Sequence, residues 1–336
     1  MKRPLFVFAG QSNMMGAAVY EASEQIYYEN SYEYLHKPRR FGATIGQFKT
    51  CGFPTGEFSY KDLNLAYGDL REPEIKSDLN DYQQNCYFCP SMNNLNRPFA
   101  DFSESTHNMA TSLAPYIVKG LEEKGLACAY THIAKGGVPI SYYLEGQAAD
   151  YFIEKVTDFF ADCAVRFKED DMDEKVLVWL QGESDSDSGY EYYMDALKRL
   201  WITAKKIGFT KFFIVRVGYW GSEKIVDVMR AQEDFSRERK DTFIITRVCS
   251  FMDFYGQDTN RWFRDRDNDE FTFCRDSFYG FDNQHINEKG FRLIAKYAIP
   301  NIIRILYESH EPVLEQERIK FELQEYMCET KDGFYK

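Results

Sequence analysis

One serine follows shortly after an apolar run near the amino terminus. Residues 5–9 are typical of a buried strand, and Gly10, Gln11 and Ser12 follow it. A hydroxyl at the carboxyl end of a first strand lies where open α/β sheets usually bind their ligands. Ser12 is therefore a candidate nucleophile, although a serine here can also cap a helix, and these residues alone do not decide between the two roles.

Two later segments carry the residue types that a nucleophilic serine needs. Gln181 follows the apolar residues 175–180, and Asp282 precedes His285 by three positions. A histidine can accept the serine proton, a carboxylate can hold the imidazole in the right tautomer, and an amide can donate to the oxyanion. The order Ser12, Gln181, Asp282, His285 thus predicts ester hydrolysis.

Each candidate also has a purely structural explanation. Asp282 can belong to a turn, and His285 can simply precede a helix cap. Gln181 and Glu183 can cap the helix that follows them, where an acidic side chain suits the helix dipole. Asn13 is interpreted as a turn residue that steadies the serine loop. The joint occurrence of the candidate groups favours catalysis over these separate explanations.

Three short blocks resemble those of a known enzyme superfamily. GQSNM at residues 10–14, QGESD at 181–185 and DNQH at 282–285 are similar to the blocks of the SGNH (GDSL-type) hydrolases, and a fourth block surrounds residues 134–137. Within that superfamily the match is to the branch of sialate O-acetylesterases and acetylxylan esterases. The resemblance implies a serine esterase that removes O-acetyl groups from a carbohydrate, such as sialic acid or a xylan-type oligosaccharide.

The resemblance also implies a role for each site residue. Ser12 would be the nucleophile, His285 the general base and Asp282 the carboxylate that orients it. The oxyanion hole would combine the backbone N–H groups of Ser12 and Gly137 with the side-chain amide of Gln181. An acyl-enzyme intermediate follows from this arrangement.

Further residues are assigned supporting roles. Gly136 is the less favoured alternative to Gly137 as an oxyanion donor, and Gln11, Asn13 and Glu183 are candidates for support of the site. The predicted reaction needs no metal and no cofactor. The partner is the acetylated carbohydrate itself.

The chain departs from the family pattern after the glycine pair. Many relatives carry a threonine and later a tryptophan there, whereas this chain has Val138 and Pro139, followed by Tyr142 and Tyr143. These tyrosines can stack on a sugar ring, but ordinary packing is the favoured interpretation. An esterase or thioesterase of another specificity, and a carbohydrate-binding protein without activity, therefore stay open as alternatives.

The elements that must position these residues alternate along the chain. Five apolar stretches predict parallel strands, at residues 5–9, 126–134, 175–180, 211–217 and 242–248, and amphipathic helical patterns lie between them. This alternation predicts an α/β protein with a five-stranded parallel sheet between helices on both faces, and the resemblance implies a three-layer sandwich of flavodoxin-like strand order. A single domain is predicted over residues 1–310, with insertions at about 20–100 and 250–280 that shape the cleft, and a helical tail over 311–336.

Composition excludes several functional classes. The net charge of −12 opposes binding to nucleic acid or to an anionic membrane. No apolar run approaches the roughly 18 residues of a membrane span, and the sequence lacks the pattern of a signal peptide, so a cytoplasmic protein is expected. Eight scattered cysteines are typical of reduced thiols, and Cys86 and Cys89 make only half of a zinc site.

Overall fold

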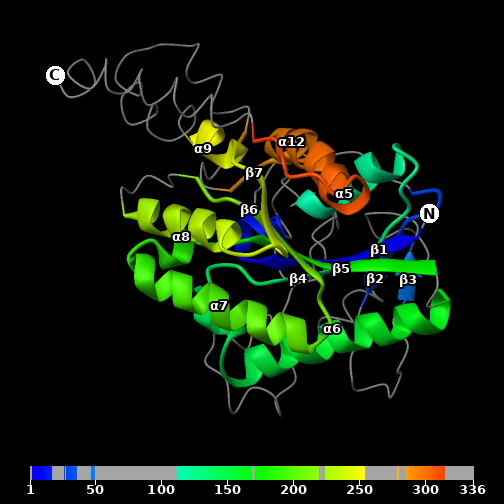
Figure 1. Ribbon diagram of the computed structural model, residues 1–336, viewed down its shortest axis with the longest axis horizontal. Helices are drawn as coiled ribbons and strands as arrows, with labels where there is room; N and C mark the ends of the chain where they lie inside the picture. Colours follow the sequence, from blue (N-terminus) through cyan, green and yellow to red (C-terminus); the bar gives the residue numbers. More distant parts are fainter. Residues whose placement is uncertain are drawn as a thin grey trace, which may run out of the picture.

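The protein folds around one β-sheet, with helices on both of its faces (Figure 1). The computed structural model describes residues 2–16, 26, 28–35, 47–49, 112–168, 171–218, 224–253, 278–279 and 285–314. The strand order is β3-β2-β4-β1-β5-β6-β7. The strands are β1 (Arg3–Gly10), β2 (Tyr32–Leu35), β3 (Gln47–Lys49), β4 (Ala129–Ala134), β5 (Met172–Leu180), β6 (Lys211–Val215) and β7 (Thr242–Thr246).

All five predicted strands are present, as β1, β4, β5, β6 and β7. They pair in parallel, and among themselves they follow the flavodoxin-like order, with β1 between β4 and β5. The predicted total of five is wrong, because β2 adds a sixth parallel strand beside β4 and the short β3 pairs antiparallel with β2. Both added strands lie in the stretch that the sequence marked as an insertion.

Strand β2 has no continuous apolar run and is held in the sheet by polar side-chain contacts, so its sequence does not predict it. Its four residues, Tyr-Glu-Tyr-Leu, include one charged side chain between two tyrosines, and the Tyr34 hydroxyl donates to Asp162 at 2.5 Å. Ser31 Oγ accepts the Cys128 N–H at 3.0 Å, and Glu122 accepts the backbone N–H groups of residues 29–31. Side-chain hydrogen bonds of this kind hold a short strand without a continuous apolar sequence.

The helices form the two outer layers. Figure 1 shows one layer that contains α5 (Leu113–Glu122), α9 (Val248–Asp253) and α12 (Glu288–Tyr307), and on the opposite side of the sheet α6 (Gly146–Arg166), α7 (Tyr190–Lys206) and α8 (Ile225–Arg237). Asn287 caps the beginning of α12, since its side chain accepts the Gly290 N–H at 3.2 Å. Three short elements lie among the loops: α1 (Ser12–Met15), η3 (Ile140–Tyr143) and η5 (Glu183–Asp185).

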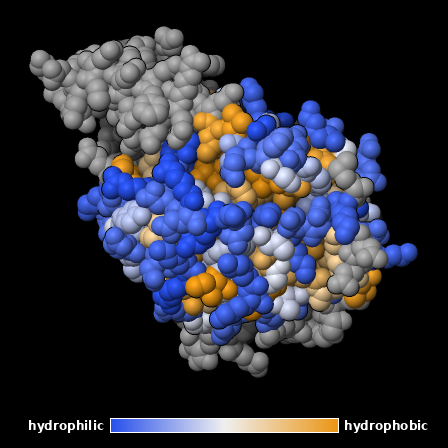
Figure 2. Space-filling view, viewed as in Figure 1, coloured by the Kyte–Doolittle hydropathy of each residue, from blue (hydrophilic) through white to orange (hydrophobic). Residues whose placement is uncertain are grey.

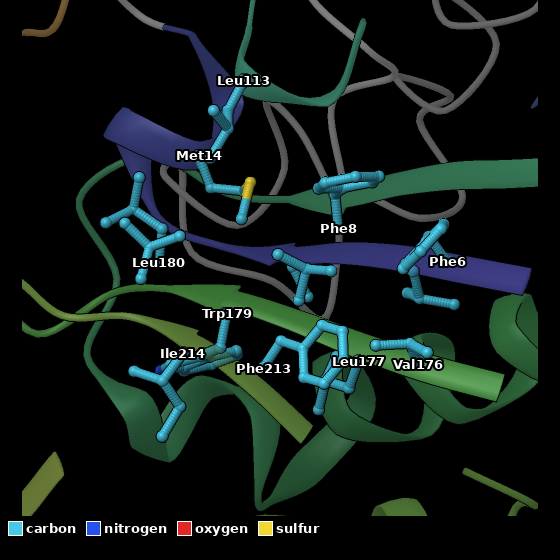
Figure 3. Close-up of a cluster of buried hydrophobic side chains, with 14 of the residues drawn as sticks. Phe6, Phe8, Met14, Leu113, Val176, Leu177, Trp179, Leu180, Phe213 and Ile214 are labelled. Atoms are coloured by element: carbon cyan, nitrogen blue, oxygen red, sulfur yellow. The ribbon is translucent and has the colours of Figure 1, made fainter. Parts of the chain in front are cut away.

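The core begins at the central strand and includes the first turn after it. Apart from Arg3, every residue of β1 is buried, as expected for a strand covered on both faces. Met14 and Leu113 are fully buried, and Figure 3 shows their side chains together, close to Phe8. Met14 therefore attaches the turn that carries Ser12 to the hydrophobic core under α5.

One face of the molecule is mostly polar, and three described cysteines are free. Figure 2 shows mostly hydrophilic residues on the face that it presents, with small apolar areas between them. Cys128, Cys163 and Cys249 are free and buried, whereas Cys86 and Cys89 lie outside the described residues. In the part of the chain that the structure describes, no helix combines the length and apolarity that a membrane crossing requires.

The division into a domain and a tail stays a prediction. Of the expected insertion at about 20–100, the structure describes residues 26, 28–35 and 47–49, and the expected insertion at 250–280 is described only at its two ends. Helix α12 ends at Tyr307, and the chain is described to Leu314, so most of the predicted tail lies outside the described residues.

Replacement of Gly10 by alanine should destabilise the protein by roughly 2–4 kcal/mol. Gly10 has a φ of 148°, and a Cβ there would lie 2.0 Å from the Leu180 carbonyl oxygen, which is backbone and cannot rotate away. Urea unfolding of wild type and Gly10→Ala measures the difference. Gly125→Ala is the matched control, because its φ is 80° but nothing lies within 4 Å of the added Cβ, so only about 1 kcal/mol is expected. Equal losses in the two variants would contradict the steric explanation.

Candidate active site

The candidate residues leave the sheet at one edge. Gly10, the last residue of β1, pairs with Ala134 at the end of β4 and with Leu180 at the end of β5. Because these neighbouring strands are parallel and end in register, the segments that follow them start side by side. Ser12, the glycine pair after residue 135 and Gln181 are thus gathered at the edge where α/β sheets bind ligands.

The turn that carries Ser12 is built on close backbone contacts. The Gln11 N–H donates to the Leu180 carbonyl at 3.2 Å, an approach that the absence of a Cβ on Gly10 permits. Ser12 is the first residue of α1, and its carbonyl accepts the Gly16 N–H at 3.0 Å. A first helical position leaves its N–H without an acceptor inside the helix, so this donor suits an oxyanion.

Asn13 links the serine turn to the segment that carries His285. Its Nδ2 donates to Glu183 Oε1 at 2.7 Å, and its Oδ1 accepts the Ile286 N–H at 3.0 Å. The residues next to Ser12 and His285 are therefore hydrogen-bonded to each other across 273 positions of sequence. Asp282, the predicted third member of the triad, lies outside the described residues.

Glu183 is a buried carboxyl with one unused oxygen. Only 7 % of the residue is exposed, and its Oε2 has no hydrogen-bond partner. Loss of hydration raises the pKa of Glu183, and the Asn13 hydrogen bond and the charge of His285 partly oppose that rise. The supporting role of Glu183 in the site stays a prediction.

Gln181 is buried, and its side-chain amide is engaged within the protein. Its Nε2 donates to Asp185 Oδ2 at 2.6 Å and to the Val138 carbonyl at 3.2 Å, while its Oε1 accepts from the Tyr193 hydroxyl at 2.9 Å. Both amide hydrogens thus have protein acceptors. Donation to an oxyanion stays a prediction for Gln181, and it requires the amide to exchange one of these partners for the substrate.

Asp185 is a site residue that the sequence reasoning left without a role. Its Oδ2 accepts from Gln181 and from the Ile140 N–H at 2.7 Å, so it ties the segment after Gly137 to the end of β5. Gly137 itself is exposed and has a φ of 68°, a left-handed conformation that favours glycine. Asp185 is the last residue of the QGESD block, four positions after Gln181, and this spacing is the sequence signal for its role.

Tyr143 is part of the support of the serine turn. Its hydroxyl donates to the Gly10 carbonyl at 2.5 Å and accepts the Gly10 N–H at 3.2 Å, and the residue has no exposed surface. The favoured interpretation of Tyr143 as a packing residue is confirmed. Gln11 has a comparable role, because its Oε1 accepts the Ser184 N–H at 3.2 Å.

Comparisons with known proteins give only distant likenesses. No family model and no curated protein matches the chain. A protein from Arabidopsis thaliana is 11% identical over 91% of this chain and 100% of its own, with a TM-score of 0.46. A family 3 carbohydrate esterase from Clostridium thermocellum is 12% identical over 59% of this chain and 88% of its own, with a TM-score of 0.39. A carbohydrate acetylesterase from Xanthomonas citri is 12% identical over 91% of this chain and 56% of its own, with a TM-score of 0.42.

Stability should depend on pH through Asp185. Burial raises the pKa of Asp185, so the folded protein binds this proton more tightly than the unfolded chain does. We expect wild type to lose stability relative to Asp185→Asn as pH rises from about 4, the ordinary pKa of aspartate, until the raised pKa is passed. Urea unfolding over a series of pH values checks this, with the exposed Asp187→Asn as control. A difference between wild type and Asp185→Asn that does not vary with pH would count against it.

Proposed function

We propose that this protein is a serine esterase that removes O-acetyl groups from a carbohydrate. The observation that carries the proposal is the hydrogen bond that the Ile286 N–H donates to Asn13, which joins the Ser12 turn to the His285 segment, while Asn13 itself donates to Glu183 after β5. A hydroxyl and an imidazole from distant parts of the chain, at the ligand-binding edge of a parallel sheet, are the two groups that acyl transfer needs.

The reaction would proceed in two halves. Ser12 Oγ attacks the ester carbonyl while His285 takes its proton, and the oxyanion accepts hydrogen bonds from the N–H groups of Ser12 and Gly137. His285 then gives the proton to the departing sugar oxygen, which leaves an acetyl group on the serine. Water, deprotonated by His285, attacks that acetyl group, the bond to Ser12 Oγ breaks, and His285 returns the proton to Ser12 as acetate is released. Asp282 is proposed to orient the imidazole, and Glu183 to stabilise its charged form.

The carbohydrate specificity rests on the sequence resemblance. The blocks at residues 10–14, 181–185 and 282–285 are similar to those of sialate O-acetylesterases and acetylxylan esterases. The residues at the edge of the sheet by themselves support hydrolysis of an acyl ester. The acetyl group and the sugar therefore need a direct test with several substrates.

Replacement of Ser12 by alanine should lower kcat by about 10³ or more, because the nucleophile is lost while the fold is kept. The measurement is acetate release from O-acetylated sialic acids and from acetylated xylo-oligosaccharides. Ser236→Ala is a matched control. Ser236 lies in the last turn of α8, and its carbonyl accepts from Thr242, the first residue of β7. It therefore lies at the amino-terminal ends of the strands, on the opposite side from Ser12.

The same assay separates the alternatives. Preference for long-chain esters over acetyl esters would replace the carbohydrate proposal by another esterase specificity. If the wild-type protein binds acetylated sugars without releasing acetate, and the Ser12→Ala variant binds them equally well, the protein is a carbohydrate-binding protein and the esterase proposal is wrong.

A further inference from the structure

We infer that Asn13 is a positioning residue for the general base. Its single carboxamide holds Glu183 on one side and the backbone beside His285 on the other, and in this way fixes where the imidazole stands relative to Ser12. The inference rests on the proposed esterase function and assigns Asn13 a specific task in it, beyond that of a turn residue.

The geometry requires a side chain that donates and accepts at once. Asn13 Nδ2 donates to Glu183 Oε1 at 2.7 Å, and Oδ1 accepts from the Ile286 N–H at 3.0 Å. An amide supplies both groups from one planar unit, whereas alanine supplies neither and aspartate only accepts. Asn13 is 3 % exposed, so water cannot readily replace either bond.

The position of Asn13 in α1 lets it act without entering the reaction. Successive helical residues point about 100° apart, so Asn13 and Ser12 face different directions from the same turn. Met14, the next residue, is fully buried against the core and fixes the orientation of that turn. A rigid turn can therefore present the hydroxyl to substrate and the carboxamide to the segment that carries the base.

The link also controls a charge. Glu183 is buried, its Oε2 is unpartnered, and the Asn13 hydrogen bond is the largest of the influences that lower its pKa against the effect of burial. The donor from Asn13 thus stabilises the ionised carboxylate within range of His285. Removal of Asn13 would alter both the place of the base and the electrostatic field around it.

Two variants test this inference. Asn13→Ala removes both bonds, and we expect kcat on an acetyl ester to fall about 10- to 100-fold with KM changed much less, because the base is displaced and not the substrate. Asn13→Asp keeps the acceptor for Ile286 but places a second carboxyl at 2.7 Å from Glu183 Oε1. The two carboxyls must then share a proton, and this proton is lost at alkaline pH. Activity should therefore fall at alkaline pH as well as at acidic pH, and the pH profile of kcat/KM should become bell-shaped.

Amide hydrogen exchange supplies a readout that does not depend on activity. The Ile286 N–H should lose protection in Asn13→Ala and keep it in Asn13→Asp, as measured in protein labelled with ¹⁵N-isoleucine. Asn30→Asp, at an exposed position outside the site, is the control for the added charge and should leave the pH profile as in wild type.

The outcomes of the two proposals can be told apart. An active wild type, whose kcat, pH profile and Ile286 protection are all kept in Asn13→Ala, would overturn the positioning role and leave the esterase intact. A wild type without esterase activity would remove the proposed function itself, whatever the exchange data for Ile286.

Discussion

The site depends on one constraint, which is that polar groups at the ends of β1, β4 and β5 must find partners away from water. Buried N–H, C=O and amide groups are costly when unpaired, so each is tied to another segment of the chain. Tyr143 satisfies both backbone groups of Gly10, and Asp185 collects the Gln181 amide and the Ile140 N–H. The network continues to β6, because Gln232 donates to the Gln181 carbonyl and accepts the Val217 N–H.

Three of the buried carboxyls in the described residues behave in two different ways. Glu233 lies between the guanidinium groups of Arg216 and Arg247, and their charges hold the pKa of Glu233 below its ordinary value despite burial. Glu183 and Asp185 have uncharged hydrogen-bond donors instead, so burial prevails and their pKa values are raised. The carboxyls near the candidate site are thus the ones whose ionisation the fold opposes, a pattern that is frequent at functional sites.

The positioning of the serine turn links stability to function. Gly10 permits the backbone of the turn to touch the end of β5, Met14 fixes the turn to the core, and Asn13 extends its influence to the segment that carries His285. The same short stretch therefore serves packing, backbone pairing and the placement of two candidate catalytic groups. Polar interactions of this kind cost stability when they are incomplete, as the unpartnered oxygen of Glu183 illustrates.

The sequence by itself determined the five parallel strands and pointed to the candidate groups, because continuous apolar runs and short polar blocks at strand ends are local signals, whereas the order of those strands was expected only from the family resemblance. It missed β2, whose four residues are held by side-chain bonds from elsewhere, and it left Asp185 without a role. Only the tertiary structure decided that Asn13 meets Ile286 and that the Gln181 amide is engaged by Asp185. Such pairings join residues that are far apart in sequence, and their partners are chosen by burial and geometry that no local pattern encodes.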